Sequence, residues 1–416
     1  MVMIHTIALS SWADQEVGHA KLGDFRCTRR LVQLLAACAL AGAGTVTAVC
    51  KTDAERQAAY DFLENQAIQP QAIADGIHQA TANRCRPEPF VFVPIDGTSL
   101  KLANPHGRKD FGSIGTRKSG ARGLKVINAM AVNPDGVPLG LTAQVYWNRT
   151  GDPARKGHQK RRVEDKETRH WLAAMQQSHD VLHQQAPETK LCFLLDREGD
   201  SWPVFAKATA LGCDLIVRAN HNRRLRSGAS EYLWPVMTSK PLLGTYELDV
   251  VARPDRQRRT ATMAVRAAPV LLDLKDKRTD RHLPSAHLQA VHAVEISRVP
   301  EGEKPIEWLL LTTLPADGFD DACAVVWSYA QRWRIEEFHR TWKSGQSNVE
   351  QTQLHSQQAV LKWAAIQASV AMRSVRLAYL AQRQPDLPAT VACVFRAKPG
   401  TNSIPRRAVI PLEGGH

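Results

Sequence analysis

The sequence predicts an α/β protein in which a small all-helical domain precedes a mixed sheet with an inserted antiparallel β region. Three observations predict this. Apolar residues recur at helical spacing over residues 1–75, and from about residue 90 they follow the shorter period of strands. Between 90 and 220, strand-like and helix-like segments alternate. Between 225 and 312, several strand-like segments follow one another.

The first 75 residues form the predicted helical N-terminal domain. Helices are expected at 12–23, 24–42 and 52–66. The Gly-containing stretches LGD and AGAGT separate them. Arg26, Arg29 and Arg30 cluster at the start of the second helix, where they either contact phosphates or form a solvated face.

The segments after residue 90 predict a sheet. FVFVPIDG (90–97) is a short apolar strand, and LKVINAMAV, NPDG and VPLGLTAQVYWN predict a hairpin that turns at Asp135-Gly136. A helix at 164–185, the strand LCFLLD, a helix near 201–212 and the strand DLIVRAN follow in that order. This order fits a mixed sheet of the ribonuclease H-like kind.

The second predicted domain spans 76–383 and includes the β insertion at about 225–312. The insertion contains GTYELDVVA, TATMAVRAA, HAVEISRV and EWLLLTTL, joined by basic loops. Helices are expected at 329–345 and 360–383. Residues 384–416 lose helical periodicity and predict an irregular Pro-rich tail without further helices.

Composition indicates a soluble protein with a polyanionic partner. The chain has 416 residues, a formal charge of +13 and a sequence pI near 9.5, which favours nucleic acid as the partner. The eight cysteines include no C-x-x-C pair, so we expect free thiols in a reducing compartment. The opening residues do not resemble a signal peptide, and the apolar stretch 31–50 is interrupted by Gln33 and AGAGT. We therefore expect a cytoplasmic protein that acts at DNA.

Two aspartates follow predicted strands. Asp96 follows FVFVPI, and Asp196 follows LCFLL. Ligands gather at the carboxyl ends of strands in open sheets, so the two carboxylates are candidates for one site. Either residue could instead be a turn or helix-capping residue. Glu198 and Asp200 are close rivals of Asp196, and one of them could pair with Arg197.

A third carboxylate lies in YAQRWRIEEFHRTWKSG (329–345). On one continuous helix, Tyr329, Arg332, Glu336 and Lys343 would lie within about 60° of one another. Apolar side chains occupy the opposite face, and Glu337 is turned about 100° away from the polar row. A solvated amphipathic helix with salt bridges is the alternative interpretation.

Three carboxylates suit Mg²⁺ or Mn²⁺ better than zinc, because these ions prefer oxygen ligands. Two such ions about 4 Å apart can activate an attacking oxygen and stabilise a leaving oxygen at a phosphodiester. The residue types therefore favour metal-dependent chemistry on nucleic acid.

The spacing of Tyr329, Arg332, Glu336 and Lys343 resembles the Y-R-E-K pattern of bacterial insertion-sequence DDE transposases of the insertion sequence four type. RWRIEEFHRTWKSG is similar to the corresponding part of this family. DGTSL (96–100) and DREGD (196–200) resemble the first and second aspartate motifs of the family. LGDFRCTRRL and AAYDFLEN resemble its helical N-terminal domain, and GSIG and IEWLLLTTLP also fit.

The resemblance implies roles for individual residues. Asp96, Asp196 and Glu336 would form the catalytic triad and hold Mg²⁺ or Mn²⁺, as two ions. The implied DNA contacts are Tyr329, Arg332 and Lys343 at transposon-end phosphates, Arg218 and His221 in a basic loop, and Trp308 and Trp333 as stacking candidates for a flipped base. Trp308 could instead be a packed strand residue.

The implied function is cut-and-paste DNA transposition. The implied substrate is double-stranded DNA, both the terminal inverted repeats and the target, and the protein would be a homodimer when the ends are synapsed. Hydrolysis at the transposon end would release a 3′-hydroxyl that joins DNA by transesterification, by way of a hairpin. The family's C-terminal dimerisation helices are not evident after residue 383, so a DNA-binding remnant that does not cut is the alternative.

Overall fold

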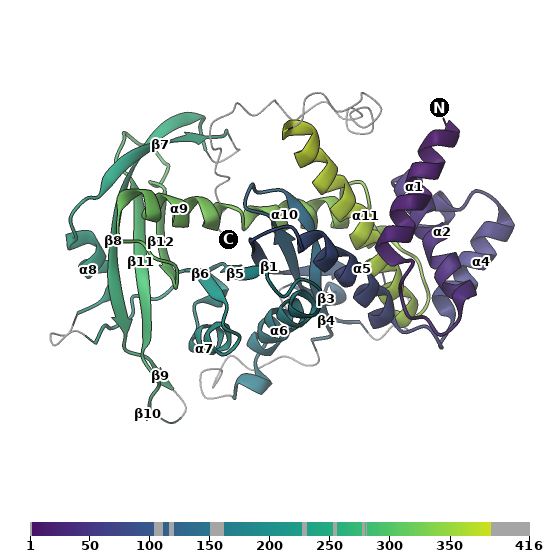
Figure 1. The fold of residues 1–416 in the computed structure, drawn as a ribbon, viewed down its shortest axis with the longest axis horizontal. Helices are drawn as coiled ribbons and strands as arrows, with labels where there is room; N and C mark the ends of the chain where they lie inside the picture. Colours follow the sequence, from purple (N-terminus) through teal and green to yellow (C-terminus); the bar gives the residue numbers. More distant parts are fainter. Residues whose placement is uncertain are drawn as a thin grey trace. The chain divides into compact units, whose positions relative to one another are not determined.

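The structure is a computed structural model of the 416-residue chain (Figure 1). It describes residues 2–103, 111–115, 120–149, 162–226, 231–252, 256–276, 279 and 281–383, with side chains from Ile7 onward. The predicted tail, 384–416, lies outside the described residues. The chain divides into two compact units. The first contains the described parts of Met1–Ala154, Ala173–Lys190 and Arg334–Phe395; the second contains those of Arg155–Leu172 and Leu191–Trp333.

The N-terminal part of the first unit is helical, as the sequence predicts. Its helices are α1 (Val2–Val17), α2 (Phe25–Ala41), α3 (Val46–Val49), α4 (Asp53–Glu64) and α5 (Pro70–Cys85). Asp24 caps α2 by accepting from the Arg26 amide, and Gly42 ends that helix in a left-handed conformation. Thr52 and Glu55 form a capping box on α4. Helical structure extends to Cys85, beyond the expected limit at residue 75.

The long helix α11 (Gln357–Arg383) packs against these N-terminal helices. Lys362 is fully buried, and its ammonium donates to the carbonyls of Leu63 (2.9 Å) and Asn65 (2.7 Å) at the end of α4. Trp363 Nε1 donates to the Gly44 carbonyl at 2.8 Å. The Lys362 bonds satisfy carbonyls at the end of α4, and the Trp363 bond satisfies a carbonyl of the loop between α2 and α3. The N-terminal helices and α11 therefore share one core.

The first unit also contains an antiparallel group of strands. They are β1 (Phe90–Lys101), β2 (Gly112–Ser113), β3 (Arg122–Val132) and β4 (Pro138–Trp147). β3 pairs with β1 along one edge, and with β2 and β4 along the other. The β3–β4 hairpin is confirmed, and Gly136 adopts a positive φ of 79° in its turn. On α6 (Thr168–Gln185), the buried Ser178 hydroxyl lies 2.8 Å from Thr142 of β4.

The second unit is built on a mixed sheet in the order β5-β6-β12-β11-β8-β7. Its strands are β5 (Lys190–Leu195), β6 (Asp214–Arg218), β7 (Gly244–Val250), β8 (Arg259–Leu272), β11 (Ala286–Glu295) and β12 (Glu307–Thr312), with a small hairpin of β9 (Lys275–Asp276) and β10 (Arg281–His282). β5 and β6 are parallel, and the other pairs are antiparallel. The unit also contains α7 (Trp202–Ala210), α8 (Leu233–Ser239) and α9 (Phe319–Ala330).

The region predicted as a β insertion continues the sheet of the second unit. Its strands are antiparallel, as expected. However, β12 pairs with β6 through Leu310↔Arg218 and Leu311↔Val217, so the insertion is not a separate β layer. The reason is that EWLLLT is buried at almost every position, which is the pattern of a central strand.

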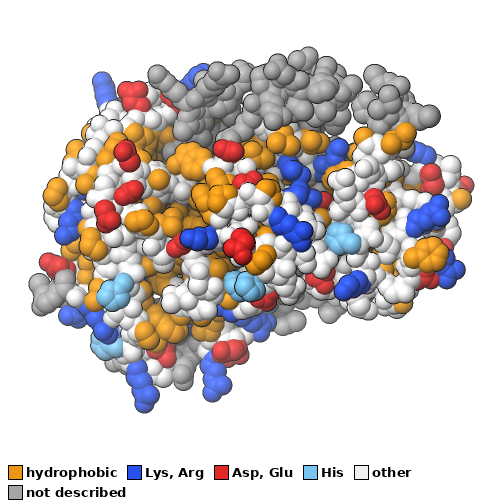
Figure 2. All heavy atoms as spheres, viewed as in Figure 1, with side chains coloured by type: hydrophobic (Ala, Val, Ile, Leu, Met, Phe, Trp, Pro, Cys, Tyr) orange, Lys and Arg blue, Asp and Glu red, His pale blue; other side chains and the backbone are white. Residues whose placement is uncertain are grey.

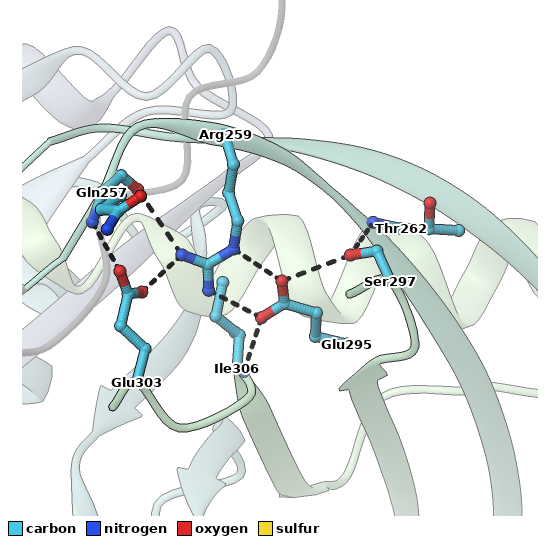
Figure 3. A network of polar contacts seen from close by, with 7 residues as sticks. All are labelled: Gln257, Arg259, Thr262, Glu295, Ser297, Glu303 and Ile306. Carbon is cyan, nitrogen blue, oxygen red and sulfur yellow. Dashed lines mark hydrogen bonds and ion pairs between the residues drawn. The ribbon is translucent and has the colours of Figure 1, made fainter. Parts of the chain in front are cut away.

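A buried ion network joins β8, β11 and the loop before β12 (Figure 3). Arg259 donates to both carboxylate oxygens of Glu295, at 2.7 and 2.9 Å, and to Glu303 at 2.6 Å. Glu295 also accepts from the Ile306 amide, and Glu303 accepts from the Gln257 amide. One guanidinium with two carboxylates therefore fixes three backbone segments of this unit.

Candidate functional site

Asp96 lies inside β1 and not at its end, which corrects the expectation from the sequence. β1 continues to Lys101 because GTSLK keeps its backbone pairing with β3, from Asp96↔Asn128 to Lys101↔Gly123. The Asp96 side chain is half-buried, and its Oδ1 accepts from the Gly97 amide at 2.7 Å. The aspartate therefore projects from the middle of a paired strand.

Asp96 shares a sheet face with two buried amides. In the strand register, Asp96 is opposite Asn128, which is opposite Gln144. Residues directly opposite one another in antiparallel strands project to the same face. Gln144 Nε2 donates to Asn128 Oδ1 at 2.9 Å, and Asn128 Nδ2 lies 3.0 Å from His339 Nε2. The face that carries Asp96 is therefore the face on which α10 (Trp333–Lys343) lies.

Glu336 lies on the side of α10 that meets this sheet face. His339 and Lys343 follow Glu336 by three and seven positions, so the three residues lie on one side of the helix. His339 contacts Asn128, and Lys343 Nζ donates to Thr98 Oγ1 at 3.3 Å. Thr98 is two residues after Asp96 and shares its face. Two half-buried carboxylates of the first unit, Asp96 and Glu336, are thus carried by contacting surfaces of β1 and α10.

Glu337 is turned toward α11, which confirms that it leaves the polar row. Its carboxylate accepts from the Tyr379 hydroxyl and lies 3.8 Å from Arg334. The Arg334 guanidinium lies 4.1 Å from the centroid of the Tyr379 ring. Burial raises the pKa of Tyr379, so its hydroxyl stays protonated and acts as a donor. This cluster attaches α10 to α11.

The single continuous helix predicted over 329–345 is wrong. α9 ends at Ala330, a turn occupies 331–332, and α10 begins at Trp333. The amides of Gln331 and Arg332 bond to the carbonyls three residues earlier, both at 3.0 Å, so the last turn of α9 tightens and the helix stops. Tyr329 and Arg332 therefore do not share a helix face with Glu336 and Lys343.

Tyr329 and Arg332 are buried in the second unit, each 3% exposed. The Arg332 guanidinium lies 5.9 Å from the Tyr329 ring centroid, and the Trp308 ring meets Tyr329 edge-on at 6.1 Å. Trp308 is also 3% exposed on β12, and Trp333 is buried. The structure therefore packs Trp308 in the core of its unit, which was the alternative to a base-stacking surface.

Asp196 follows β5 directly, as the sequence predicts. It caps the short 3₁₀ helix Arg197–Gly199, and its Oδ1 accepts from the Glu198 amide at 2.8 Å. Its side chain is half-buried, whereas Arg197 and Glu198 are exposed. Asp196 belongs to the second unit, and Asp96 and Glu336 belong to the first.

Asp200 is a buried organising residue whose role the sequence did not indicate. Its carboxylate accepts from the amides of Asn220 (2.8 Å) and His221 (3.0 Å), and it forms an ion pair with Arg223 at 2.7 Å. Asp200 thus pairs with Arg223 and not with the neighbouring Arg197. The D-R-E-x-D pattern in the sequence could have singled out Asp200, its last aspartate. Only the fold shows that Asp200 holds the loop that contains His221.

The remaining candidate DNA contacts differ in exposure. Arg218 is 9% exposed and donates to the Glu307 carbonyl at 3.0 Å, whereas His221 is exposed. Arg26, Arg29 and Arg30 are all exposed on α2. Arg26 pairs with Asp24 at 2.7 Å, and this hydrogen bonding lowers the pKa of the Asp24 carboxyl. Phe25 beside them is 77% exposed.

The described surface carries charges of both signs, and the candidate carboxylates supply oxygen ligands that a metal ion could bind. Figure 2 shows Lys and Arg side chains spread over the drawn face with acidic side chains between them. Among the described residues, no three His, Cys, Asp or Glu side chains gather as a metal site requires. The carboxylates of Asp96 and Glu336 have the oxygen donors that Mg²⁺ prefers. A metal ion at these residues stays a prediction.

Residues 9–68, which run from α1 to just beyond α4, match a family described as transposase DNA-binding. The match supports a transposase. It includes Arg26, Arg29 and Arg30, and it supports DNA as the partner of this part of the chain. None of the described helices is both long and apolar enough to cross a membrane.

Proposed function

We propose that this chain is a DDE transposase of the insertion-sequence type, which cuts transposon ends and joins them to DNA. The observation that carries the proposal is the contact of α10 with β1 and β3. The bonds His339–Asn128 and Lys343–Thr98 hold the Glu336 side of α10 against the sheet face of Asp96. A carboxylate pair built on rigid elements in this way is the arrangement that metal-dependent phosphodiester chemistry needs.

In this proposal Asp96, Asp196 and Glu336 hold two Mg²⁺ or Mn²⁺ ions. The ions would supply Lewis-acid stabilisation of the charge that develops on the phosphodiester oxygens. Backbone amides fix two of the carboxylates. The Gly97 amide donates to Asp96, and the Glu198 amide donates to Asp196. Water or a DNA 3′-hydroxyl attacks the phosphorus, and the leaving 3′-oxygen departs, so no protein–DNA covalent bond forms.

Lys343 is the best-placed cation of the Y-R-E-K set for a DNA phosphate. Its ammonium is bound only loosely, 3.3 Å from Thr98 Oγ1 and 3.9 Å from Glu350. It can exchange these partners for a phosphate oxygen at small cost, because both are partly solvated. Tyr329 and Arg332 are buried, so in this proposal they act by supporting the end of α9 next to Trp333.

The helical region supplies end binding in this proposal. Residues 9–68 carry the match to transposase DNA-binding, and the exposed Arg26, Arg29 and Arg30 offer charge to the DNA backbone. The same proposal includes a ribonuclease H-like topology and the formation of a DNA hairpin. It also includes dimerisation at synapsed ends and a location at the bacterial nucleoid. The mixed α/β architecture after the helical region is consistent with it.

The test is cleavage of transposon-end DNA by purified protein with Mg²⁺ or Mn²⁺. Asp96→Ala, Asp196→Ala and Glu336→Ala are each expected to abolish nicking and to leave end binding within about twofold of wild type. Glu188→Ala, an exposed carboxylate of the first unit, is the matched control and should cut normally.

The proposal fails for any triad residue whose alanine variant cuts at the wild-type rate. If the wild-type protein binds end DNA but never nicks it with either metal, the chain is a DNA-binding remnant. Joined products with a target duplication would distinguish a transposase from a nuclease that only cuts.

A further inference from the structure

The first unit contains a cavity of about 190 Å³ between α1, α5 and α11, apart from the carboxylates described above. Trp12 and Glu16 come from α1, Arg84 from α5, and Arg373 and Arg376 from α11. Apolar side chains complete the lining. A liquid water molecule occupies about 30 Å³, so the cavity can hold a small anion with part of its hydration shell.

Glu16, the only carboxylate among the described residues that line this cavity, already has hydrogen-bond partners. Glu16 is 4% exposed, and it accepts from Arg84 at 2.7 Å and from Ser369 at 3.2 Å. Arg84 also donates to the Leu139 carbonyl at 2.7 Å and to Thr81 Oγ1 at 3.1 Å. Glu16 and Arg84 therefore form a satisfied pair, and neither needs an added ligand.

Arg373 and Arg376 line the same cavity, and neither forms an ion pair with a described carboxylate. Within the described part of the chain, neither makes an ion pair or an accepted hydrogen bond, and the Arg376 Nε–H is shielded from solvent without an acceptor. The Arg373 guanidinium lies 5.0 Å from the Trp12 ring centroid. Burial lowers the pKa of both arginines, and the charge of Arg84 adds to this at Arg376, while the Glu16 carboxylate partly offsets the lowering at both. Both side chains are half-buried. A guanidinium N–H that is shielded without an acceptor, as at Arg376 Nε, is costly, and a bound anion would remove that cost.

The described lining residues leave an excess of two positive charges, since three arginines face one glutamate. We propose that this cavity binds a phosphate group, with Arg373 and Arg376 as its ligands. A phosphate monoester carries a charge of about −1.5 to −2 at neutral pH, which matches this excess. Its several oxygens suit the planar donor sets of two guanidinium groups. The group comes either from a free phosphate compound or from a DNA backbone.

Binding of inorganic phosphate to the full-length protein tests the proposal. Phosphate should raise the Tm of the wild-type protein saturably, because a ligand that binds only the folded state stabilises it. Arg373→Gln and Arg376→Gln should each weaken phosphate binding about tenfold or more, as expected for a lost charged hydrogen bond. Lys190→Gln removes an exposed charge of the same unit and should keep the wild-type shift. Sodium chloride at equal ionic strength controls for screening.

A second measurement does not depend on phosphate. Arg376→Met removes a partly shielded charge and keeps the length of the side chain, so its Tm without phosphate should equal or exceed that of wild type. A large fall in Tm for Arg376→Met would mean that Arg376 already has a partner, and this result would overturn the proposal. An equal phosphate shift in wild type and both glutamine variants, or no shift in wild type, would also overturn it.

Competition identifies the source of the phosphate group. If a DNA backbone occupies the cavity, transposon-end DNA should displace phosphate, and the two glutamine variants should bind DNA more weakly. If a free phosphate compound occupies it, phosphate and DNA should bind together, and DNA affinity should not change. The site does not depend on the carboxylate triad, so Asp96→Ala should bind phosphate normally. Loss of cleavage and loss of phosphate binding are therefore separable results.

Discussion

Asn128 of β3 lies opposite Asp96 in the sheet and bonds to His339 of α10, with 3.0 Å between Asn128 Nδ2 and His339 Nε2. Asn128 is fully buried, and His339 is 8% exposed. Because Gln144 occupies the other side of Asn128, the amide cannot turn away without losing a second hydrogen bond. This bond therefore fixes α10, and with it Glu336, against the strand that carries Asp96.

Asn128→Ala should loosen this attachment. The variant leaves Gln144 and His339 without their buried partner, and the free energy of unfolding should fall by about 1–3 kcal/mol. Cleavage of end DNA should fall more than end binding, because Glu336 loses its fixed position. Urea denaturation and cleavage rates measure the two effects. Gln184→Ala, an exposed amide of the same unit, is the control. Unchanged cleavage in Asn128→Ala would show that this bond does not position Glu336.

Lys343→Met should remove one phosphate contact. The binding constant falls with salt, and each phosphate contact contributes about −0.9 to the slope of its logarithm against the logarithm of salt concentration. The slope of Lys343→Met should therefore be less negative by about that amount. Fluorescence anisotropy over a range of salt concentrations measures it. Lys190→Met loses an exposed charge elsewhere in the unit and should keep the wild-type slope. Equal slopes for wild type and Lys343→Met would contradict a phosphate contact at Lys343.

Asp200→Ala should release the loop that contains His221. The Asp200 side chain is fully shielded, and removing one partner of a buried ion pair costs about 3–5 kcal/mol. The amides of Asn220 and His221 also lose their acceptor. Limited proteolysis should cut near 220–223 much faster than in wild type. Glu198→Ala removes an exposed carboxylate of the same motif and should leave the cutting rate unchanged. Equal protection in both variants would contradict the role of Asp200.

The network around Arg259 should make the second unit sensitive to acid. Burial raises the pKa of Glu295, but the hydrogen bonds from Arg259, the Ile306 amide and Ser297, together with the Arg259 charge, outweigh this and hold the pKa below its usual 4.5. Bonding to the Gln257 amide lowers the pKa of Glu303. A lowered carboxyl pKa contributes stability above the unfolded-state pKa, and that stability is lost as pH falls through the folded-state pKa.

The expected result is a fall in the free energy of unfolding from about pH 5 downward. In Glu295→Gln, the free energy of unfolding should be lower at pH 7 and should fall less steeply with acid. Chemical denaturation at several pH values measures both. Glu301→Gln, an exposed glutamate of the same loop, should follow wild type. A slope in Glu295→Gln as steep as in wild type would place the acid sensitivity elsewhere.

Local patterns determined most of the secondary structure. The helical region, the β3–β4 hairpin, α11 and the antiparallel strands after α8 follow from apolar period, Gly breaks and the Asp135-Gly136 turn. Two expectations about element ends failed. β1 continues past Asp96 because it pairs with β3, a strand distant in the chain. The helix at 329–345 breaks at 331–332, where the last turn of α9 tightens.

The sequence by itself determined which residues are candidates for chemistry. Residue type, spacing and the family resemblance made Asp96, Asp196, Glu336 and Lys343 candidates, and their roles stay predictions. Only the tertiary structure decided what surrounds them. It buried Tyr329, Arg332 and Trp308, assigned Asp200 to Arg223, and joined α10 to β3 through Asn128 and His339. It also brought Arg373 and Arg376 of α11 to a cavity beside α1. Periodicity reports which side of one element a residue occupies, whereas burial and ion pairing depend on elements that are distant in the chain.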